Sequence, residues 1–411
     1  MKLRIAAVEP YFGGSHRHFL LDLQRHSRHD IRLLTLPPRL WKWRVRGASL
    51  HLARALSEAA AGGGEAPGAA ARAANADAAT SGTRRFDLLL CSDFVNLPDL
   101  RALLRPDLRA VPVLYYMHEN QLTYPLSPDE EFDPYFGFTN VLSCLSAEAV
   151  AFNSEYHRRV FLEQLPGFLP RLPDYEPRWV ADTIAAKAEV LPIGIDLAEL
   201  ESLRPQAGDG TAAGPEGAPA SLEGTPHRPE GTPRHVLWNH RWEFDKRPER
   251  FFAALDRLAA ENVPFVVDVV GESFARQPAV FAAARARLGA RCGRFGYVES
   301  RQEYLRLLWQ SNIVVSTADQ EFFGISMAEA TLCGAHPIAP RALVYEELYA
   351  GSCDRRHLYR DDDELVALLR QALAAAPPAH DCVIPTRLRA LGWAQLAPRF
   401  DARFESLVRS R

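Results

Sequence analysis

The stretch Glu321-Phe-Phe-Gly-Ile-Ser-Met-Ala-Glu329 follows an apolar run, Ile313-Val-Val-Ser-Thr-Ala318, and these two segments together decide the fold that we expect. The apolar run predicts a strand. The residues after it predict a tight loop and then a helix that begins near Gly324. The first glutamate would lie in the loop, and the second would lie about two turns into the helix.

This loop and helix start have the features of a nucleotide-sugar site. The start of a helix offers free backbone N–H groups and the positive end of the helix dipole, and both suit a diphosphate. Gly324 lets the backbone come close to a ligand. Glu321 and Glu329 could accept hydrogen bonds from sugar hydroxyls on either side of the phosphates. On this segment alone, an ordinary loop and helix with two solvated glutamates is an equally good interpretation.

Length and composition limit the class of protein. The 411 residues, of which 47% are hydrophobic, suffice for two domains that each have their own core. The 48 basic and 51 acidic residues give a formal charge of −3, so any contact with RNA has to be a local basic patch. The six cysteines form no C-x-x-C pair, which argues against a zinc site and against a disulfide framework.

Neither a signal peptide nor a membrane span is expected. The segment Met1-Lys-Leu-Arg-Ile-Ala-Ala-Val-Glu9 is too short, and charged too early, to be a signal peptide. No stretch reaches about 18 uncharged apolar residues, the length that a transmembrane helix needs. We therefore expect a cytoplasmic protein without a membrane partner.

Apolar runs of strand length alternate with helical patterns, which predicts parallel sheets covered by helices on both faces. The fold class is therefore α/β, with two Rossmann-like parallel-sheet domains that face each other across a cleft. The expected strands are residues 5–8, 31–36, 86–92, 111–117, 149–153, 235–239, 265–270, 294–297 and 313–316. The expected helices are residues 18–26, 97–104, 136–147, 250–261, 275–288, 302–310, 325–333 and 390–408.

Two low-complexity segments interrupt this alternation, and the second of them separates the two domains. Residues 59–83 consist almost entirely of Ala, Gly and small polar residues and predict a disordered insertion. Residues 204–234 are rich in Gly, Pro and Thr and predict a flexible linker. The N-terminal domain would then cover residues 1–203, the nucleotide-sugar domain residues 235–389, and a C-terminal helix residues 390–411.

A cationic motif, His240-Arg-Trp-Glu-Phe-Asp-Lys246, follows the first expected strand of the second domain. Arg241 and Lys246 can neutralise a diphosphate, and Arg can do so with two hydrogen bonds. Because the leaving group gains charge in the transition state, such cations would lower the barrier to its departure. In isolation a solvated charged loop is the favoured interpretation, but together with residues 321–329 the motif favours a diphosphate site.

Two polar motifs follow expected strands of the first domain. Gly13-Gly-Ser-His16 would let the backbone approach a phosphate or a sugar, although a plain tight turn explains it equally well. It lacks the G-x-G-x-x-G pattern, which disfavours a nicotinamide site. His118-Glu-Asn120 carries a histidine that can orient a hydroxyl or accept a proton, although a lone histidine is more often structural. Asn153-Ser154 either lines the same cleft or caps the next helix.

Two further segments have competing interpretations. Asp361-Asp-Asp363 matches a metal-binding D-x-D pattern, but it precedes a helical pattern, so helix capping explains it and no metal site is expected. Arg39-Leu-Trp-Lys-Trp-Arg-Val-Arg46 interleaves cations with two indoles, which suits stacking on unpaired bases. Taken alone, this second segment favours a helix that packs both tryptophans inward and turns its charges outward.

Together these residues resemble GT-B glycosyltransferases of family 4. More specifically, the chain resembles the tRNA-queuosine alpha-mannosyltransferase family, also described as glycosyltransferase-like domain-containing protein 1. The resemblance covers nearly the whole chain apart from the two low-complexity segments. The most specific matching motifs are Trp41-Lys-Trp-Arg44 and His118-Glu-Asn-Gln-Leu122. The other matching motifs are Tyr11-Phe-Gly-Gly-Ser-His16, Leu142-Ser-Cys-Leu145, Phe152-Asn-Ser154, Trp238-Asn-His-Arg-Trp-Glu-Phe-Asp-Lys246, Gly271-Glu-Ser-Phe274 and Glu321-Phe-Phe-Gly-Ile325.

The resemblance implies transfer of mannose from GDP-mannose to the cyclopentene-diol of queuosine in tRNA, with retention of the anomeric configuration and without a metal or other cofactor. Carried over to this chain, the residues with a role in catalysis would be His118, Arg241, Lys246 and Glu321. The donor-binding residues would be Gly14, Arg241, Lys246, Gly271, Phe323, Gly324, Ile325 and Glu329. The acceptor-binding residues would be Gly13, His16, Lys42, Trp43, Arg44, Arg46, Glu119 and Asn120.

Three alternative functions compete with this one, of which a sugar-nucleotide epimerase of the same fold is disfavoured by the resemblance. The first is a family-4 transferase that acts on a lipid, a glycan or a small molecule, for which the chain shows no amphipathic basic helix with a clean apolar face. The second is a non-catalytic protein that binds nucleotide sugars or RNA. The joint presence of Arg241, Lys246, Glu321 and Glu329 argues against the loss of catalysis.

Overall fold

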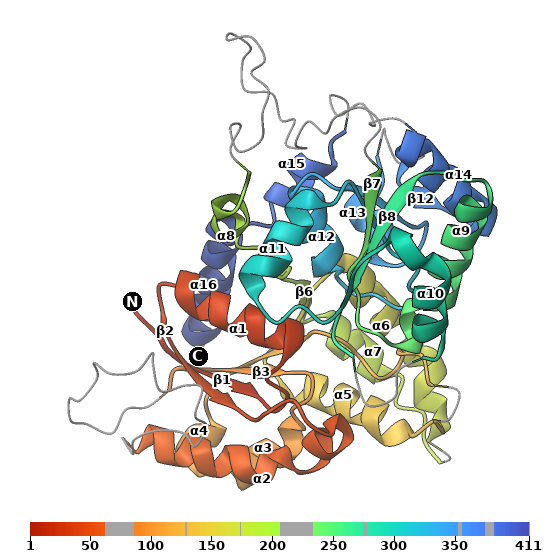
Figure 1. Ribbon diagram of the computed structural model, residues 1–411. Helices are drawn as coiled ribbons and strands as arrows, with labels where there is room; N and C mark the ends of the chain where they lie inside the picture. Colours follow the sequence, from red (N-terminus) through yellow and green to blue (C-terminus); the bar gives the residue numbers. More distant parts are fainter. Residues whose placement is uncertain are drawn as a thin grey trace. The chain divides into compact units, whose positions relative to one another are not determined.

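The computed structural model describes residues 1–61, 86–127, 130–172, 174–205, 233–273, 278–351, 356–374 and 382–410. The chain forms two compact units, which are Met1–Gly194 with Trp393–Arg411, and Ile195–Gly392 (Figure 1). The predicted insertion at 59–83 lies outside the described residues except for 59–61, where a helix ends. The predicted linker at 204–234 lies outside them except for two residues at each end.

The N-terminal unit is built on a six-stranded sheet with the order β2-β1-β3-β4-β5-β6. All neighbouring strands are parallel, and β1 and β3 pair with Ile5 opposite Leu88. The residues of β3, β4 and β5 are all buried, as expected for a sheet covered on both faces. The strands are β1 Arg4–Glu9, β2 Asp30–Thr35, β3 Leu88–Ser92, β4 Val113–Met117, β5 Ala149–Phe152 and β6 Ala188–Val190.

Helices cover both faces of this sheet. Figure 1 shows α1 on one face and α2, α3 and α4 on the other. Helix α16 packs beside α1, where Phe400 contacts Phe19 and Tyr116 with ring centroids 5.7 and 6.0 Å apart. The helices of this unit are α1 Gly14–His26, α2 Trp41–Ala60, α3 Leu97–Leu103, α4 Pro106–Arg109, α5 Pro134–Ser146, α6 Glu155–Phe168, α7 Trp179–Ala185 and α16 Trp393–Arg409. The C-terminal helix therefore belongs to the N-terminal unit.

The C-terminal unit has a second parallel sheet, with the order β12-β11-β10-β7-β8-β9. Its strands are β7 Arg234–Trp238, β8 Phe265–Val270, β9 Cys292–Gly296, β10 Ile313–Val315, β11 His336–Pro340 and β12 Leu358–Tyr359. Both sheets confirm the prediction of two Rossmann-like parallel-sheet domains.

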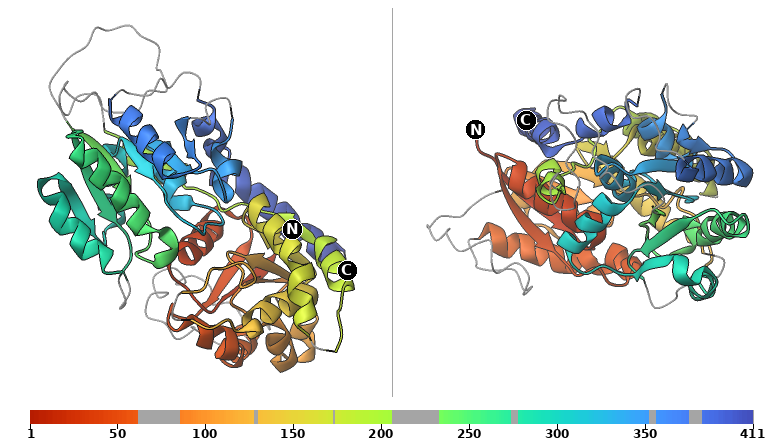
Figure 2. Two further views of the ribbon diagram at one scale, coloured as in Figure 1. Left: turned by 90° about the vertical axis from the view of Figure 1, so that its right-hand side faces the viewer. Right: turned by 45° about the horizontal axis from the view of Figure 1, so that its top comes forward.

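The helices of the C-terminal unit pack on this second sheet. Helices α9, α10 and α14 contribute apolar residues to one core, and Figure 2 shows α9 and α10 side by side. The helices are α8 Leu197–Ser202, α9 Pro248–Ala260, α10 Val280–Leu288, α11 Arg301–Gln310, α12 Ile325–Leu332, α13 Val344–Tyr349, α14 Asp362–Ala374 and α15 Ile384–Arg389.

Most element boundaries agree with the expected ones within a few residues. Helix α1 begins at Gly14, four residues before the predicted start at residue 18, because two glycines do not prevent a helix start. Asp361 accepts a hydrogen bond from the Glu364 backbone N–H at 2.9 Å, which confirms the predicted helix capping. The sequence did not predict α6, which contains Pro166, or the three-residue strand β6.

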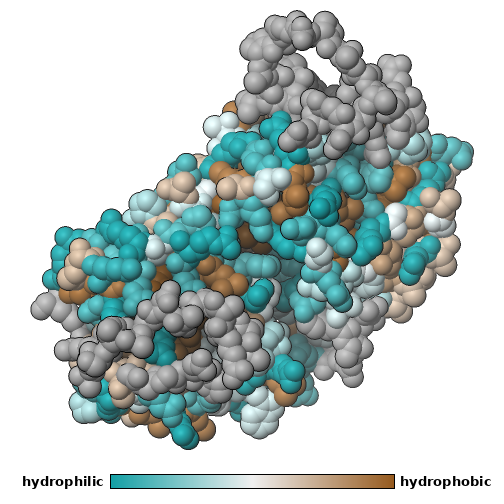
Figure 3. Space-filling model, turned by 60° about the vertical axis from the view of Figure 1, so that its left-hand side comes forward, coloured by the Kyte–Doolittle hydropathy of each residue, from teal (hydrophilic) through white to brown (hydrophobic). Residues whose placement is uncertain are grey.

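The described helices include none that is long and apolar enough to cross a bilayer. On the face shown in Figure 3, hydrophilic residues predominate among the described residues, and hydrophobic residues lie between them. Such a mixed surface is ordinary for globular proteins.

Candidate functional site

The strand order places the cationic motif and Glu321 next to each other in the C-terminal unit. The first strand of this unit, β7, lies between β8 and β10, so the chain leaves β7 and β10 toward opposite sides of the sheet. Ligands of doubly wound sheets bind at such a switch point, beyond the carboxyl ends of the strands. The loop after β7 carries Arg241 and Lys246, and the loop after β10 carries Glu321. The structure therefore brings Glu321 beside Lys246, which lies 75 residues earlier in the sequence.

Lys246 is the buried cation of this site. Its side chain is only 7% exposed, and Nζ donates a hydrogen bond to the Gln320 carbonyl at 2.6 Å. Nζ also lies 3.2 Å from Asp245 Oδ2 and 3.4 Å from Glu321 Oε2. Burial alone would lower the pKa of Lys246, but Glu321 and Asp245 raise it above its usual value. Lys246 is therefore a charged donor between two carboxylates.

Glu321 is held in place by the start of helix α12. Its Oε1 accepts hydrogen bonds from the Gly324 N–H at 3.1 Å and from the Phe323 N–H at 3.4 Å. Gly324 precedes the helix with φ of 74°, a conformation that glycine adopts without strain. Burial raises the pKa of Glu321, but Lys246, His240 and the two N–H groups lower it below its usual value overall. Glu321 is thus an ionised carboxylate that backbone N–H groups hold in place.

Arg241 is the more accessible cation. Its side chain is 41% exposed, and its Nη2 lies 3.2 Å from Glu243 Oε2. The positive charge of Arg241 is also close enough to Lys246 to lower the pKa of that lysine. The next residue, Trp242, stacks on Phe281 of α10 with ring centroids 4.1 Å apart and an interplanar angle of 3°. This stacking holds the backbone of the loop in place. The exposed guanidinium of Arg241 can therefore reach a ligand while its backbone stays fixed.

Gly271 permits a close approach of two strand ends. A Cβ atom at this position would lie 1.8 Å from the carbonyl oxygen of His240. His240 is itself buried, and Nε2 lies 3.1 Å from the Val315 carbonyl oxygen. Burial, with Lys246 nearby, lowers the pKa of His240 to about 4, so the ring is neutral at pH 7. Backbone packing is thus one physical reason for glycine at 271, a position predicted for donor binding.

Glu329 has a partner that sequence reasoning missed. It lies in α12, and both of its carboxylate oxygens accept hydrogen bonds from the guanidinium of Arg301. Arg301, the first residue of α11, also donates to Glu199 at 3.0 and 3.1 Å. No sequence motif marks Arg301, because the two residues of this pair come from different helices. The carboxylate predicted to hold the donor ribose is therefore oriented by an arginine.

The N-terminal unit has its own switch point between β1 and β3. Glu9 ends β1, and the turn after it carries Gly13 and His16 at the start of α1. His16 Nδ1 lies 2.9 Å from Glu9 Oε2, and both side chains are buried. Asp93 follows β3 and is 2% exposed. Sequence reasoning missed Glu9 and Asp93, although their position at the ends of parallel strands was a usable signal.

His118 lies at the centre of a second cluster, which consists of Glu9, His16, Asp93 and His118. Its backbone N–H donates to Asp93 Oδ1 at 3.0 Å, and its carbonyl accepts from Asn153 Nδ2 at 2.9 Å. Its ring stacks on His16, with centroids 4.0 Å apart and planes inclined by 28°. Ser154 caps α6 by accepting a hydrogen bond from the His157 N–H at 3.0 Å, as one of the two interpretations proposed.

Glu9, His16 and His118 place one possible metal-ligand atom each within 4.8 Å of one another. The ion pair between Glu9 and His16 accounts for two of the three groups without a metal.

Other residues predicted for the acceptor have structural partners. Asn120 is fully buried, and its Oδ1 accepts hydrogen bonds from the backbone N–H groups of Leu122 and Thr123, both at 3.0 Å. Glu119 accepts a hydrogen bond from Gln121 Nε2 at 3.0 Å. Asn120 therefore shapes the turn after β4. Gly14 adopts φ of 49° at the start of α1.

Helix α2 corrects the expectation that both tryptophans of residues 39–46 pack inward. Trp41 packs with Phe94 and Phe136, whereas Trp43 is 71% exposed. The reason is geometric, since residues two apart in a helix point to nearly opposite sides. The predicted helix itself is confirmed, and it presents an exposed indole.

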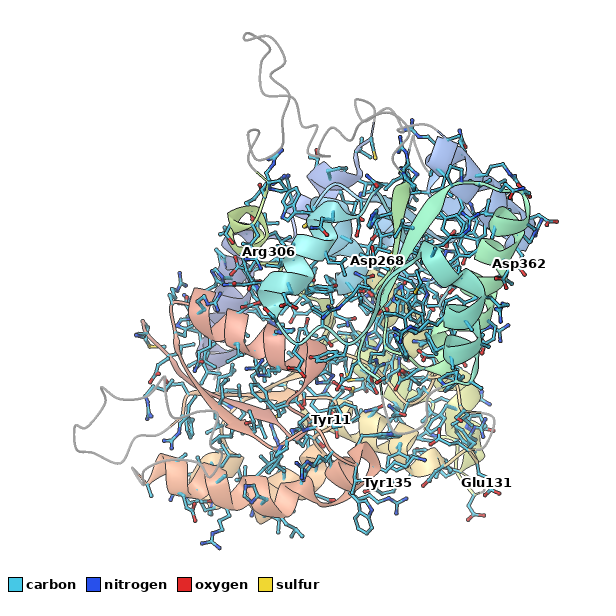
Figure 4. All side chains as sticks on the ribbon, viewed as in Figure 1. Tyr11, Glu131, Tyr135, Asp268, Arg306 and Asp362 are labelled. Atoms are coloured by element: carbon cyan, nitrogen blue, oxygen red, sulfur yellow. The ribbon has the colours of Figure 1, made fainter. Side chains whose placement is uncertain are left out.

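The cations of this segment lie beside acidic and aromatic residues. Lys42 Nζ lies 2.9 Å from Glu130, and Arg46 Nη2 lies 2.7 Å from Asp133. The guanidinium of Arg46 is also 4.4 Å from the ring centroid of Tyr135, at the edge of the N-terminal unit where Figure 4 labels Tyr135 and Glu131. Arg44 donates to the Pro37 carbonyl at 3.1 Å.

Comparisons with known proteins divide the chain at the same place as the fold. Residues 4–195 match the family described as tRNA-queuosine alpha-mannosyltransferase N-terminal, and residues 225–384 match Glycosyl transferases group 1. A curated relative, tRNA-queuosine alpha-mannosyltransferase of Drosophila melanogaster, is 33% identical over 369 residues. That alignment covers 90% of this chain and 86% of the relative.

Solved structures with the same fold are far less similar in sequence. Sucrose-phosphate synthase from Thermosynechococcus elongatus superposes with a TM-score of 0.67 at 16% identity, and each chain is fully covered. HepE from Anabaena in complex with UDP-glucose superposes with a TM-score of 0.59 at 14% identity, again with full coverage. At these identities the likeness shows the fold alone, and it confirms the GT-B class.

Proposed function

We propose that this chain, which belongs to the tRNA-queuosine alpha-mannosyltransferase family, transfers mannose from GDP-mannose to the cyclopentene-diol of queuosine in tRNA. Family membership makes it a retaining glycosyltransferase that needs no metal. The observation that carries the residue-level proposal is the cluster of Arg241, Lys246 and Glu321 at the switch point of the C-terminal unit.

Each member of this cluster has a separate role in the proposal. Arg241 and Lys246 bind the diphosphate of the donor, and they stabilise the charge that it gains as the glycosidic bond breaks. Glu321 accepts hydrogen bonds from mannose hydroxyls, because its carboxylate is ionised and fixed by the start of α12. Phe323, Gly324 and Ile325 supply the backbone beside the sugar, and Glu329, oriented by Arg301, accepts from the ribose hydroxyls.

The two cations of this site lie beside three carboxylates, so the free site offers a diphosphate no net positive charge. Lys246 is balanced by Asp245 and Glu321, so its positive charge is already compensated before any ligand arrives. Arg241 is the more exposed of the two cations, with Glu243 beside it. We therefore assign most of the affinity for the diphosphate to Arg241, and the orientation of the sugar to Lys246 together with Glu321.

The proposed reaction breaks the bond between C1 of mannose and the phosphate oxygen, and forms a bond from C1 to a hydroxyl oxygen of the acceptor on the same face of the sugar. The phosphate oxygen that leaves takes the proton of the acceptor hydroxyl. No protein nucleophile takes part, and differential stabilisation of the leaving diphosphate supplies most of the rate.

The transfer assay tests this proposal directly. The protein is mixed with GDP-mannose and queuosine-containing tRNA, and the tRNA is digested to nucleosides and analysed by mass spectrometry. One added hexose on queuosine is expected, and none on tRNA that lacks queuosine. A hexose released as free mannose without transfer to either tRNA would count against the acceptor, and no consumption of GDP-mannose would count against the donor.

We also propose that the exposed face of α2 contacts the tRNA. Trp43 is free to stack on an unpaired base, with Lys42, Arg44 and Arg46 beside it for the phosphates. Loss of the indole in Trp43→Ala is expected to weaken tRNA binding by about 1–3 kcal/mol. Leu50→Ala on the same helix, where the side chain is equally exposed, is the matched control.

The cationic part of this surface has a separate test. Replacing the three cations by alanine is expected to lower the slope of log affinity against log salt concentration, since fewer counterions are released. Unchanged binding of this variant at both low and high salt would remove the segment from the tRNA site.

A further inference from the structure

A cage of aromatic side chains fixes the ring of His118. His16 stacks on one face at 4.0 Å, while the rings of Phe19 and Tyr116 meet it edge-on with centroids at 5.0 and 4.7 Å. His118 is only 7% exposed. The ring therefore has a defined orientation before any substrate is bound, and its protonation state is set by these neighbours.

Glu9 determines the charge of the ring that stacks on His118. Its Oε2 lies 2.9 Å from His16 Nδ1, and its Oε1 accepts a hydrogen bond from the Tyr11 N–H at 2.7 Å. Burial lowers the pKa of His16, but Glu9, with smaller contributions from Asp93 and Glu119, raises the pKa to about 9. His16 also stacks on Phe94 at 5.4 Å, an aromatic face that favours a cation. At neutral pH a cationic ring thus lies between Phe94 and His118.

This cation restricts the protonation of His118. The Nδ1 atom of His118 is buried and has no hydrogen-bonding partner among the described residues. A proton on Nδ1 would therefore be an unpaired buried donor, which is costly. Burial, and then the positive charge of His16, hold the pKa of His118 well below its usual value. The neutral ring with its single proton on Nε2 avoids both a buried unpaired donor at Nδ1 and a second positive charge beside His16.

We propose that Glu9 is a positioning residue of the transfer reaction: acting through His16, it keeps His118 neutral with its proton on Nε2, so that this nitrogen donates a hydrogen bond to a sugar oxygen at the reacting centre. The inference rests on the proposed function. A neutral imidazole holds the oxygen without protonating the leaving phosphate, which has to accept the proton of the acceptor.

Two other titratable groups near this pair, Asp93 and His157, are largely neutral at neutral pH. Asp93, on the loop after β3, has its pKa raised to about 8 by burial and by Glu119 and Glu9 despite the cation of His16, so it is largely protonated at neutral pH. His157, from α6, is kept neutral because burial holds its pKa far below the usual value. The pair of Glu9 and His16 therefore brings the positive charge that acts on the ring of His118.

The test is Glu9→Gln, which keeps the shape of the side chain and an acceptor for Tyr11 but removes the charge. Glu163→Gln, which removes an exposed carboxylate of α6, is the matched control. NMR of ¹⁵N-histidine-labelled protein should show wild-type His118 neutral, with the proton on Nε2, and without titration between about pH 5.5 and 8. In Glu9→Gln, the pKa of His118 should rise by about one unit or more, because the neighbouring cation is lost.

The activity of the same variants provides the second readout. In Glu9→Gln the acid limb of kcat for mannosyl transfer should move to higher pH by the same amount, while KM for the donor stays within about twofold. Glu163→Gln should match the wild type. His16→Gln removes the cation without altering Glu9 and should shift His118 in the same way, which covers the case of a Glu9 variant that fails to fold.

Two results would overturn the proposal. One is a wild-type His118 that carries its proton on Nδ1 or titrates at its usual pKa. The other is a pKa of His118 that stays unchanged in both Glu9→Gln and His16→Gln. Because the NMR titration needs no substrate, a protein that fails to transfer mannose would refute the proposed function and leave this result interpretable on its own.

Discussion

Replacement of Lys246 by methionine gives the sharpest test of the donor site as an electrostatic unit. The variant removes the cation that Asp245 and Glu321 share, at distances of 3.2 and 3.4 Å. With an effective dielectric constant of about 20, each contact has a gross attraction of about 5 kcal/mol. Desolvation of the charges offsets much of this, and removing one partner of a buried ion pair costs about 3–5 kcal/mol. We expect the C-terminal unit to lose about that much stability.

Hydrogen exchange measures this loss in the C-terminal unit alone. The amide groups of β7 and β10 should exchange about two hundred to several thousand times faster in Lys246→Met, while those of β1 and β3 stay unchanged. Adding Glu321→Gln to this variant neutralises one orphaned carboxylate and should restore about 1–2 kcal/mol. Unchanged exchange in the single variant, or a further loss in the double variant, would refute the arrangement of charges described above.

Three other variants or conditions test separate features. Gly271→Ala places a Cβ atom 1.8 Å from the His240 carbonyl, so the strand ends must separate, and thermal unfolding should show a loss of about 3 kcal/mol. Arg301→Met leaves Glu329 unpaired and should lower the unfolding temperature, and Glu329→Gln in the same background should recover part of it; an unchanged temperature would contradict the pairing. The raised pKa of His16 stabilises the folded state below about pH 6.5, and this stabilisation is lost as the pH rises through about 9. Urea titrations of the N-terminal unit should therefore show that the free energy of unfolding falls by about 3 kcal/mol over that range. A flat profile would argue against the ion pair.

The alternation of apolar runs and helical patterns was enough to predict the architecture. Each predicted strand lies in one of the two parallel sheets, because strands buried on both faces leave a nearly continuous apolar signal. Most of the predicted donor residues follow the ends of β7 and β10, which the strand order makes neighbours. A motif placed directly after a strand was therefore a reliable guide to position, even though each motif alone had an ordinary explanation.

Partners that come from separate elements could not be predicted from the sequence. Arg301 and Glu329 belong to different helices, and their pairing depends on how α11 packs on α12. Glu9 pairs with His16 across a turn whose geometry is set by the Gly13 and Gly14 backbone. The sequence contains these residues, but the three-dimensional packing determines which charged side chains form ion pairs.

Side-chain direction was the other source of error. The two tryptophans of residues 39–46 were expected to share one face of a helix, yet Trp43 is exposed and Trp41 is packed. The spacing of two residues already excludes a shared face in a helix. Helical periodicity, applied residue by residue, would have corrected this prediction without a structure.

Binding of the donor diphosphate by Arg241 is the central proposal for this site. The decisive measurement is the dissociation constant of GDP, determined by calorimetry for the wild type and for Arg241→Gln. The side chain is 41% exposed, so the substitution should leave the fold intact. Loss of charge-assisted hydrogen bonds should weaken GDP binding by about tenfold to a hundredfold. Equal affinities in a folded Arg241→Gln variant would show that the diphosphate binds elsewhere.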